Sequence, residues 1–220
     1  LGEFTALVCA GALEFADAVR LVRNRGAYMQ SAVPVGEGAM AAVLGLDDDL
    51  VELACIEAAG SEVVAAVNFN SPGQVVIAGH TAAVQRAIAA CKEKGAKRAL
   101  PLPVSAPFHT SLMKPAGEQL ARDLAGIRIS APAVPVVHNV HAGTESEPER
   151  IRELLVQQIH SPVKWTQSVR FIVAQQVAMV LEVGPGKVLA GLCKRIDGGL
   201  ECHASEDPDD MKISIAAAAA

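Results

Sequence analysis

A histidine in a loop between an extended and a helical stretch is the first candidate for chemistry. His109 lies in the run Ser105–Ser111 (SAPFHTS), which follows a predicted strand and precedes a predicted helix. Loops at strand ends in α/β proteins often carry catalytic groups. An imidazole titrates near neutral pH, which suits a general base. A loop histidine that caps the following helix is the alternative that the residues leave open.

Two polar side chains on predicted helices could position a substrate. Arg25 precedes Gly26, which lets another group approach the helix closely. A guanidinium group binds a carboxylate through two parallel hydrogen bonds, so Arg25 could hold an acidic substrate; a solvated helix arginine is the alternative. Gln158 lies on the mostly apolar side of its helix. Since a buried amide needs partners, it could orient a substrate or a histidine, or make a structural hydrogen bond.

The other polar motifs carry weaker signals. Asn70 and Asn139 could also position groups, although turn chemistry is the default for Asn70. Gly184-Pro185-Gly186 follows an apolar strand but lacks the spacing of a phosphate-binding loop. The acidic run 47–49 is expected to cap a helix and not to bind a metal.

Composition restricts the class of protein. Of the 220 residues, 51% are apolar and 20% are charged, which favours a packed globular chain. A net charge of −5 argues against a nucleic-acid binder. Five cysteines without a CxxC pair favour free thiols in a reducing compartment. With neither a membrane span nor a secretory signal in the sequence, we expect a cytoplasmic protein.

The pattern of apolar residues predicts an α/β protein with two parts and a tail. Residues 37–104 follow a β-α-β-β-α-β order, typical of a ferredoxin-like small subdomain. Residues 1–36 and 105–200 form a large α/β core, in which strands alternating with helices imply a mostly parallel sheet. Residues 201–220 are expected to be an irregular tail that ends in a run of alanines. Helices are predicted over 4–10, 14–31, 47–59, 81–94, 111–125, 147–159, 165–174 and 187–196, and strands over 40–44, 62–69, 74–78, 98–104, 134–137 and 177–183.

Six segments occur in a characteristic order between Leu1 and about Ile196. They are LGEFTALVCAG (1–11), VRNRGAYMQ (22–30), NFNSPGQVVIAG (68–79), PFHTSLMKP (107–115), PVKW (162–165) and EVGPGKVL (182–189). Together they resemble the malonyl-CoA:acyl carrier protein transacylases of the acyltransferase family. The resemblance implies a hydrolase-like parallel-sheet core with an inserted ferredoxin-like subdomain.

The resemblance also implies a reaction. A malonyl group passes from coenzyme A to a serine and then to the phosphopantetheine thiol of acyl carrier protein, in fatty acid biosynthesis. The family motif Gly-His-Ser-Leu-Gly-Glu matches Leu1-Gly2-Glu3 at its end, so the serine is expected immediately before Leu1, and the chain is expected to be N-terminally truncated there. His109 would be the general base, the backbone N–H of Leu1 an oxyanion donor, and Gln158 a residue that holds the active-site loop.

The remaining implied roles concern the substrate. Arg25 would bind the free carboxylate of malonate, Asn70 would line the cleft between the subdomains, and Phe108 would disfavour an α-methyl group. No metal or cofactor besides the substrate malonyl-CoA is expected, and the enzyme is expected to be a monomer. Candidate basic patches for coenzyme A and the carrier protein are Lys92, Lys94, Lys97 and Arg98, and Lys187, Lys194 and Arg195. A scaffolding module of the same fold without activity, and an acyltransferase domain of a polyketide synthase, are the alternatives.

Overall fold

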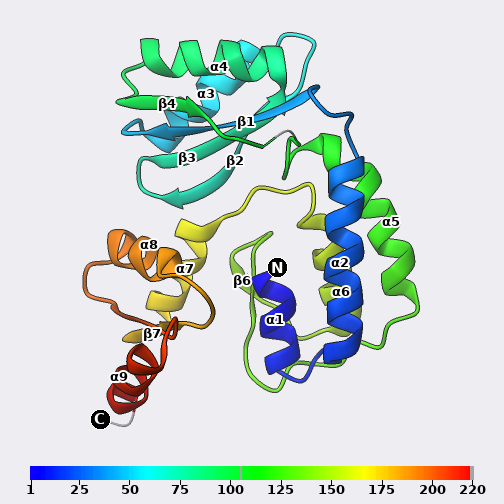
Figure 1. Ribbon diagram of the computed structural model, residues 1–220, viewed down its shortest axis with the longest axis vertical. Coiled ribbons are helices and arrows are strands. Elements are labelled where there is room, and N and C mark those ends of the chain that lie inside the picture. Colours follow the sequence, from blue (N-terminus) through cyan, green and yellow to red (C-terminus); the bar gives the residue numbers. More distant parts are fainter. Residues whose placement is uncertain (105, 219–220) are drawn as a thin grey trace.

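A helical layer forms the first part of the molecule. The computed structural model describes residues 1–104 and 106–218 (Figure 1). In this layer, α2 packs on α5 and α5 packs on α6, with α1 against α2. The helices are α1 (Gly2–Cys9), α2 (Phe15–Ser31), α5 (Lys114–Ala125) and α6 (Pro148–Gln157), preceded at α5 by the short 3-10 helix η1 (Ser111–Met113).

Helical spacing of apolar residues explains this packing. Leu120 and Leu124 on α5, and Ile151 and Leu155 on α6, recur at intervals of four residues and are fully buried. They join Leu7 of α1 in one apolar cluster. The inner faces of the four helices therefore bury a common core, which fixes Arg25 on α2 relative to Gln158 at the end of α6.

A four-stranded antiparallel sheet forms the second part. Its strand order is β2-β3-β1-β4, and helices α3 and α4 cover one face (Figure 1). The element order along the chain is the predicted β-α-β-β-α-β. The bounds are β1 (Gly38–Leu44), α3 (Asp48–Ala59), β2 (Val64–Ser71), β3 (Gln74–His80), α4 (Thr81–Glu93) and β4 (Arg98–Pro101).

The opposite face of this sheet looks toward the site. Met40, Val67 and Val76 form a second apolar cluster there, and Phe108 packs against it. Phe108 also packs against the core of the helical layer. The loop that holds His109 therefore lies where the two parts meet.

A third part combines helices with a parallel strand pair. Strand β7 pairs in parallel with β8, from Met179 opposite Glu201 to Glu182 opposite Ala204. Of the mostly parallel sheet expected in the large core, the described residues contain this two-stranded pair, whereas β5 and β6 pair antiparallel. Its elements are α7 (Trp165–Ala174), β7 (Met179–Glu182), α8 (Val188–Ile196), β8 (Glu201–Ala204) and α9 (Pro208–Ala218). The short strands β5 (Val137–His138) and β6 (Gly143–Thr144) lie beside α1 instead (Figure 1).

Two local predictions are wrong. The tail expected to be irregular over 201–220 contains β8 and α9. The signal for α9 was local: Asp207 Oδ1 accepts hydrogen bonds from the N–H groups of Asp209 and Asp210, both at 2.9 Å, as a helix-capping residue does, and alanine favours helices. The strand expected over 134–137 is confined to β5, because Pro135 has no N–H to donate to a ladder.

The described helices include none that combines the length and apolar character needed to cross a membrane.

Candidate functional site

Three predicted residues from distant segments meet where the helical layer faces the small sheet. His109 Nδ1 lies 3.1 Å from the backbone oxygen of Gln158, and Arg25 Nη2 donates to Gln158 Oε1 at 3.4 Å. Arg25 comes from the middle of α2 and Gln158 from the residue that ends α6. Gln158 therefore joins the imidazole and the guanidinium through its main chain and its side chain, respectively.

The loop around His109 has an unusual local conformation. The φ angle of His109 is 63°, in the left-handed region that a non-glycine residue rarely adopts. Its neighbour Thr110 is buried, donates to the Pro107 oxygen at 2.7 Å and accepts from the Leu112 N–H at 3.3 Å. Thr110 thus caps η1, so the alternative in which His109 is the cap is wrong. Ser105, the start of the predicted loop, lies outside the described residues.

Burial keeps the imidazole of His109 neutral. Desolvation lowers the pKa of His109, and the positive charges of Arg25 and the Leu1 amino group lower it further. Hydrogen bonds with the backbone of Gln158 and Ser161 oppose the shift in pKa. A neutral imidazole whose Nδ1–H is bonded to a carbonyl oxygen has Nε2 free to accept a proton, as a general base requires.

Arg25 is a cation in a partly desolvated position. Burial lowers the pKa of its guanidinium, and the Glu3 carboxylate opposes this shift. Among the described residues, Arg25 Nε and Gln158 Nε2 are buried nitrogens without a hydrogen-bond partner. Both are donors, so the pair can receive an acceptor such as a carboxylate.

The amino group of the first residue lies within electrostatic reach of this group. Burial lowers the pKa of the Leu1 amino group, and the nearby Arg25 cation lowers it further. In a chain that continues before Leu1, the same nitrogen is a backbone amide N–H. The structure thus brings Leu1, Arg25, His109 and Gln158 together.

Phe108 and Asn70 lie at the edges of the site. Phe108 is half-buried between the helical core and the open face of the small sheet. Asn70 is half-buried on β2. The preceding residue, Phe69, donates its N–H to the oxygen of Val163 at 2.9 Å, which places Asn70 beside the segment that follows Gln158. Their roles toward a substrate stay predictions.

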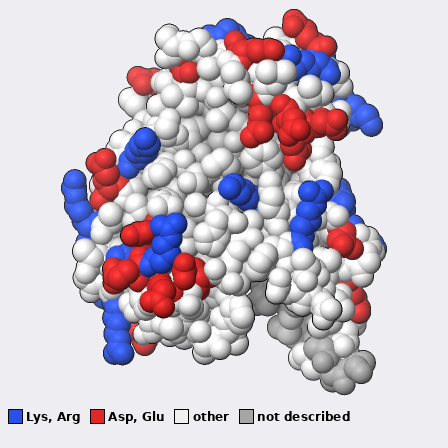
Figure 2. All heavy atoms as spheres, turned by 180° about the vertical axis from the view of Figure 1, so that it is seen from behind, with Lys and Arg blue, Asp and Glu red and all other residues white. Residues whose placement is uncertain are grey.

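The candidate basic patches are partly neutralised by ion pairs. Lys94 lies 2.8 Å from a Glu57 oxygen, and Lys187 lies 2.7 Å from an Asp210 oxygen. The face shown in Figure 2 carries basic and acidic side chains close together around a largely uncharged middle. A binding surface for an anionic partner therefore rests on the remaining cations of each patch.

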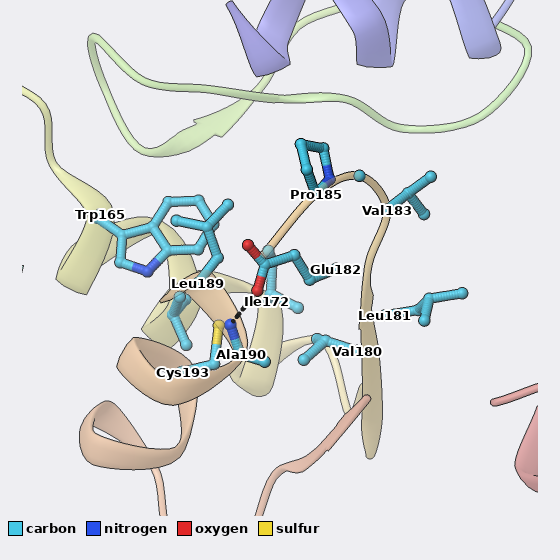
Figure 3. Close-up of a pocket in the computed structure, with 12 residues that line it drawn as sticks. Trp165, Ile172, Val180, Leu181, Glu182, Val183, Pro185, Leu189, Ala190 and Cys193 are labelled. Carbon is cyan, nitrogen blue, oxygen red and sulfur yellow. Dashed lines mark hydrogen bonds between the residues drawn. The ribbon is translucent and has the colours of Figure 1, made fainter. Parts of the chain in front are cut away.

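An apolar groove lies apart from this site. It has a volume of about 440 Å³ between α7, β7 and α8, and Trp165, Val180, Leu189 and Cys193 are among the residues that line it (Figure 3). The carboxylate of Glu182 also lines it but accepts the Ala190 N–H at 2.8 Å (Figure 3). The groove is lined by none of the predicted site residues.

Sequence reasoning missed an acidic residue near the site. Glu3 Oε1 lies 2.8 Å from His138 Nδ1, and Glu3 Oε2 accepts the Asn139 N–H at 3.1 Å. Since about 135 residues separate these partners, no local pattern relates them. A glutamate in the first turn of a helix is common, because the helix dipole stabilises its negative charge. The residue type and position of Glu3 therefore do not single it out in the sequence.

The pKa shift of His109 predicts a pH dependence of stability. Because the folded pKa lies below its ordinary value of 6.5, the unfolded chain takes up a proton near pH 6.5 that the folded chain does not. The free energy of unfolding should therefore fall as pH drops below about 6.5, until the pH reaches the folded pKa. Denaturant unfolding at pH 7.5 and pH 5 would show a smaller loss in His109→Gln than in the wild type. An equal loss in both proteins would contradict a lowered pKa.

Comparison with known proteins places this geometry in context. The family described as "Acyl transferase domain" matches residues 1–197. The malonyl CoA-acyl carrier protein transacylase of Escherichia coli K12 is 59% identical over 215 residues, which cover 98% of this chain and 70% of that protein. The enzyme of the same name from Bacillus subtilis is 45% identical, with 98% and 68% covered.

Solved structures give the same result. The acyl carrier protein S-malonyltransferase of Vibrio cholerae superposes with a TM-score of 0.96 at 52% identity, covering 97% of this chain and 70% of that one. A malonyl-transacylase solved in complex with a type II polyketide acyl-carrier protein superposes with a TM-score of 0.96 at 51% identity, covering 98% and 70%.

Proposed function

This chain belongs to the acyl transferase domain family, and we propose that it transfers malonyl groups from malonyl-CoA to the phosphopantetheine thiol of acyl carrier protein in fatty acid biosynthesis. The predicted acyltransferase fold is confirmed by the TM-score of 0.96 to a malonyltransferase structure. The observation that carries the proposal is Gln158, which holds His109 through its carbonyl oxygen and Arg25 through its side chain.

The chemistry follows a two-step exchange through an acyl-serine. The family motif places a serine immediately before Leu1. Its hydroxyl attacks the carbonyl carbon of the malonyl thioester while His109 takes the proton, and the oxyanion accepts a hydrogen bond from the Leu1 N–H. The carbon–sulfur bond then breaks, and His109 returns the proton to the coenzyme A thiol. The carrier thiol attacks the acyl-serine in the same way, which frees the serine.

Arg25 recognises the acid end of the substrate. Its guanidinium and the Gln158 side chain offer donor nitrogens that no described protein group uses. A malonyl carboxylate can occupy both, whereas an acetyl group has no acceptor there. In a partly desolvated position this charge pairing is stronger than in water. These steps need a nucleophile, a base and an oxyanion donor, so we propose that the enzyme uses malonyl-CoA without a further cofactor. We also propose that it is a monomer and that it acts in the cytoplasm.

The proposal is tested with a polypeptide that places a serine before Leu1. In this serine-bearing chain, residues 1–220 follow the N-terminal part of a transacylase relative up to the motif serine. The expected result is malonyl transfer from malonyl-CoA to acyl carrier protein, with a malonyl adduct on the serine in intact-mass spectra. A folded serine-bearing chain that neither forms the adduct nor transfers malonyl would refute the proposal and favour a scaffolding module.

One observation favours a related second function. The likeness to a malonyl-transacylase solved with a type II polyketide carrier protein is as close as that to the other malonyltransferases. The same site would then deliver malonyl groups to a polyketide synthase. Comparing transfer to a fatty acid carrier and to a polyketide carrier protein distinguishes the two.

Phe108 is expected to limit the size of the acyl group. Its ring precedes His109 and fills the space between the two packed parts. A clash with one α-methyl group is worth roughly 1–3 kcal/mol, so Phe108→Ala in the serine-bearing chain should raise the methylmalonyl-to-malonyl ratio of kcat/KM by roughly tenfold or more. Competition assays with both thioesters measure this ratio. An unchanged ratio in a folded variant would place Phe108 outside the acyl pocket.

A further inference from the structure

Asn139 uses its whole side-chain amide to hold the segment between α6 and α7. It follows β5, and its Nδ2 donates to the Pro162 oxygen at 2.9 Å while its Oδ1 accepts from the Lys164 N–H at 3.0 Å. These two backbone groups flank Val163. We call residues 159–164 the α6–α7 segment.

The opposite edge of the α6–α7 segment is held by the small sheet. The Val163 N–H donates to the Val67 oxygen at 2.7 Å, and the Val163 oxygen accepts the Phe69 N–H at 2.9 Å. Backbone groups of successive residues in an extended chain point to alternate sides. The Asn139 amide therefore binds the edge of the segment that faces away from the small sheet, as a neighbouring strand would. The segment is thus held by hydrogen bonds along both edges.

Asn139 is in turn fixed by the first helix. Glu3 Oε2 accepts the Asn139 N–H at 3.1 Å, and Glu3 Oε1 lies 2.8 Å from Nδ1 of His138. The His138 side chain is fully buried and that of Glu3 is 8% exposed. Since buried charge-assisted hydrogen bonds are strong and directional, the first turn of α1 and the Asn139 loop form one unit.

The α6–α7 segment begins directly after the residue that orients His109. Gln158 presents its carbonyl oxygen to His109 Nδ1 at 3.1 Å, and the backbone of Ser161, within the segment, acts to raise the pKa of His109. We infer that Asn139, held by Glu3, is a positioning residue for His109 that acts through the α6–α7 segment. The effect of Asn139 on catalysis rests on the proposed function, but its effect on the orientation of His109 does not.

NMR of the full chain tests the orientation directly. Imidazole ¹⁵N shifts should show a proton on Nδ1 of His109 in the wild type. In Asn139→Ala, the two tautomers should mix and the pKa of His109 should fall further, because the backbone partners that oppose its lowering are displaced. Asn139→Asp, which keeps the Oδ1 acceptor and the shape but loses the Nδ2 donor, should give an intermediate change.

A matched variant separates positioning from general loosening. Asn24→Ala removes an amide that donates to Asp123 Oδ2 at 2.9 Å and joins α2 to α5, and that makes no described hydrogen bond to the α6–α7 segment. Its His109 signals should match the wild type. Unchanged His109 signals in Asn139→Ala, or equal changes in Asn24→Ala, would overturn the inference. Loss of the folded state in both Asn139 variants would also overturn it, since the role would then be structural.

Kinetics of the serine-bearing chain give the second readout. A misplaced base costs up to roughly 100-fold in rate, so Asn139→Ala should lower kcat for malonyl transfer by roughly tenfold to 100-fold. The KM for malonyl-CoA should change little, because Arg25 keeps its place on α2. A rise in KM at constant kcat would overturn the inference. An inactive unsubstituted serine-bearing chain would instead refute the proposed function and leave the NMR result to decide the role of Asn139.

Discussion

Replacing His109 with alanine in the serine-bearing chain should lower kcat for malonyl transfer by roughly 10²–10⁴-fold. General base catalysis contributes about this much to a reaction that removes a hydroxyl proton. The free Nε2 of an imidazole bonded to Gln158 through Nδ1 is the group that takes this proton. Stopped-flow release of coenzyme A measures the first half-reaction, and transfer to acyl carrier protein measures the second. Both should fall, because the same imidazole serves both.

His141→Ala is the matched control for this loss. His141 is an exposed imidazole whose Nδ1 accepts the Gly143 N–H at 3.0 Å, so its removal should leave kcat within about twofold of the unsubstituted chain, as is usual for surface substitutions. Near-normal turnover of the His109→Ala protein would remove His109 from the mechanism. A loss confined to transfer to the carrier would point to carrier binding and not to proton transfer.

Local signals allowed the order of the helices and strands between β1 and β4 to be predicted. Asp47 is the N-cap residue of α3, although its side chain makes no capping hydrogen bond. Gly60 follows α3, and the turn Pro72-Gly73 lies between β2 and β3. Capping and turn chemistry act within a few residues, so they can be read without knowing the fold. The same kind of signal is present at Asp207 and Pro208, and it contradicts the irregular tail predicted over 201–220, where α9 forms.

The site could be predicted only in part. Motifs that resemble those of a family identified Arg25, His109 and Gln158 as candidate site residues. The contacts between them were not predictable, because Gln158 contacts His109 across 49 positions and Arg25 across 133 positions. Such contacts depend on how α2, α6 and the His109 loop pack, which no periodicity encodes. The hydrogen bonds of Glu3 with His138 and Asn139 are the same case, because a buried carboxylate partner 135 residues away leaves no local pattern.

Packing, and not composition, also decides what Arg25 does. Its α2 neighbour Arg23 is exposed, whereas Arg25 is half-buried against Gln158. The two arginines are indistinguishable in residue type and lie on one helix. Burial lowers the pKa of Arg25 because it removes water from the guanidinium group. The same loss of water strengthens the attraction between this cation and a bound anion.

Arg25→Ala should therefore change which acyl group is transferred. Removing one partner of a buried, hydrogen-bonded charge pair costs about 2–5 kcal/mol, so kcat/KM for malonyl-CoA should fall roughly 30-fold or more in the serine-bearing chain. An acetyl group lacks the carboxylate, so acetyl transfer should persist or rise. The ratio of the two rates, measured with both thioesters on the same preparation, is independent of the fraction of folded protein.

Two further variants show whether malonyl selectivity needs the paired donors of the guanidinium group or only its positive charge. Arg25→Lys keeps a cation but not the planar pair of donors, and its malonyl-to-acetyl ratio should lie between those of Arg25→Ala and the unsubstituted chain. Arg23→Ala removes the exposed arginine of the same helix and should leave the ratio unchanged. An equal fall of malonyl and acetyl transfer in Arg25→Ala would mean that Arg25 supports the site as a whole. The malonyl carboxylate would then have to be bound by another group.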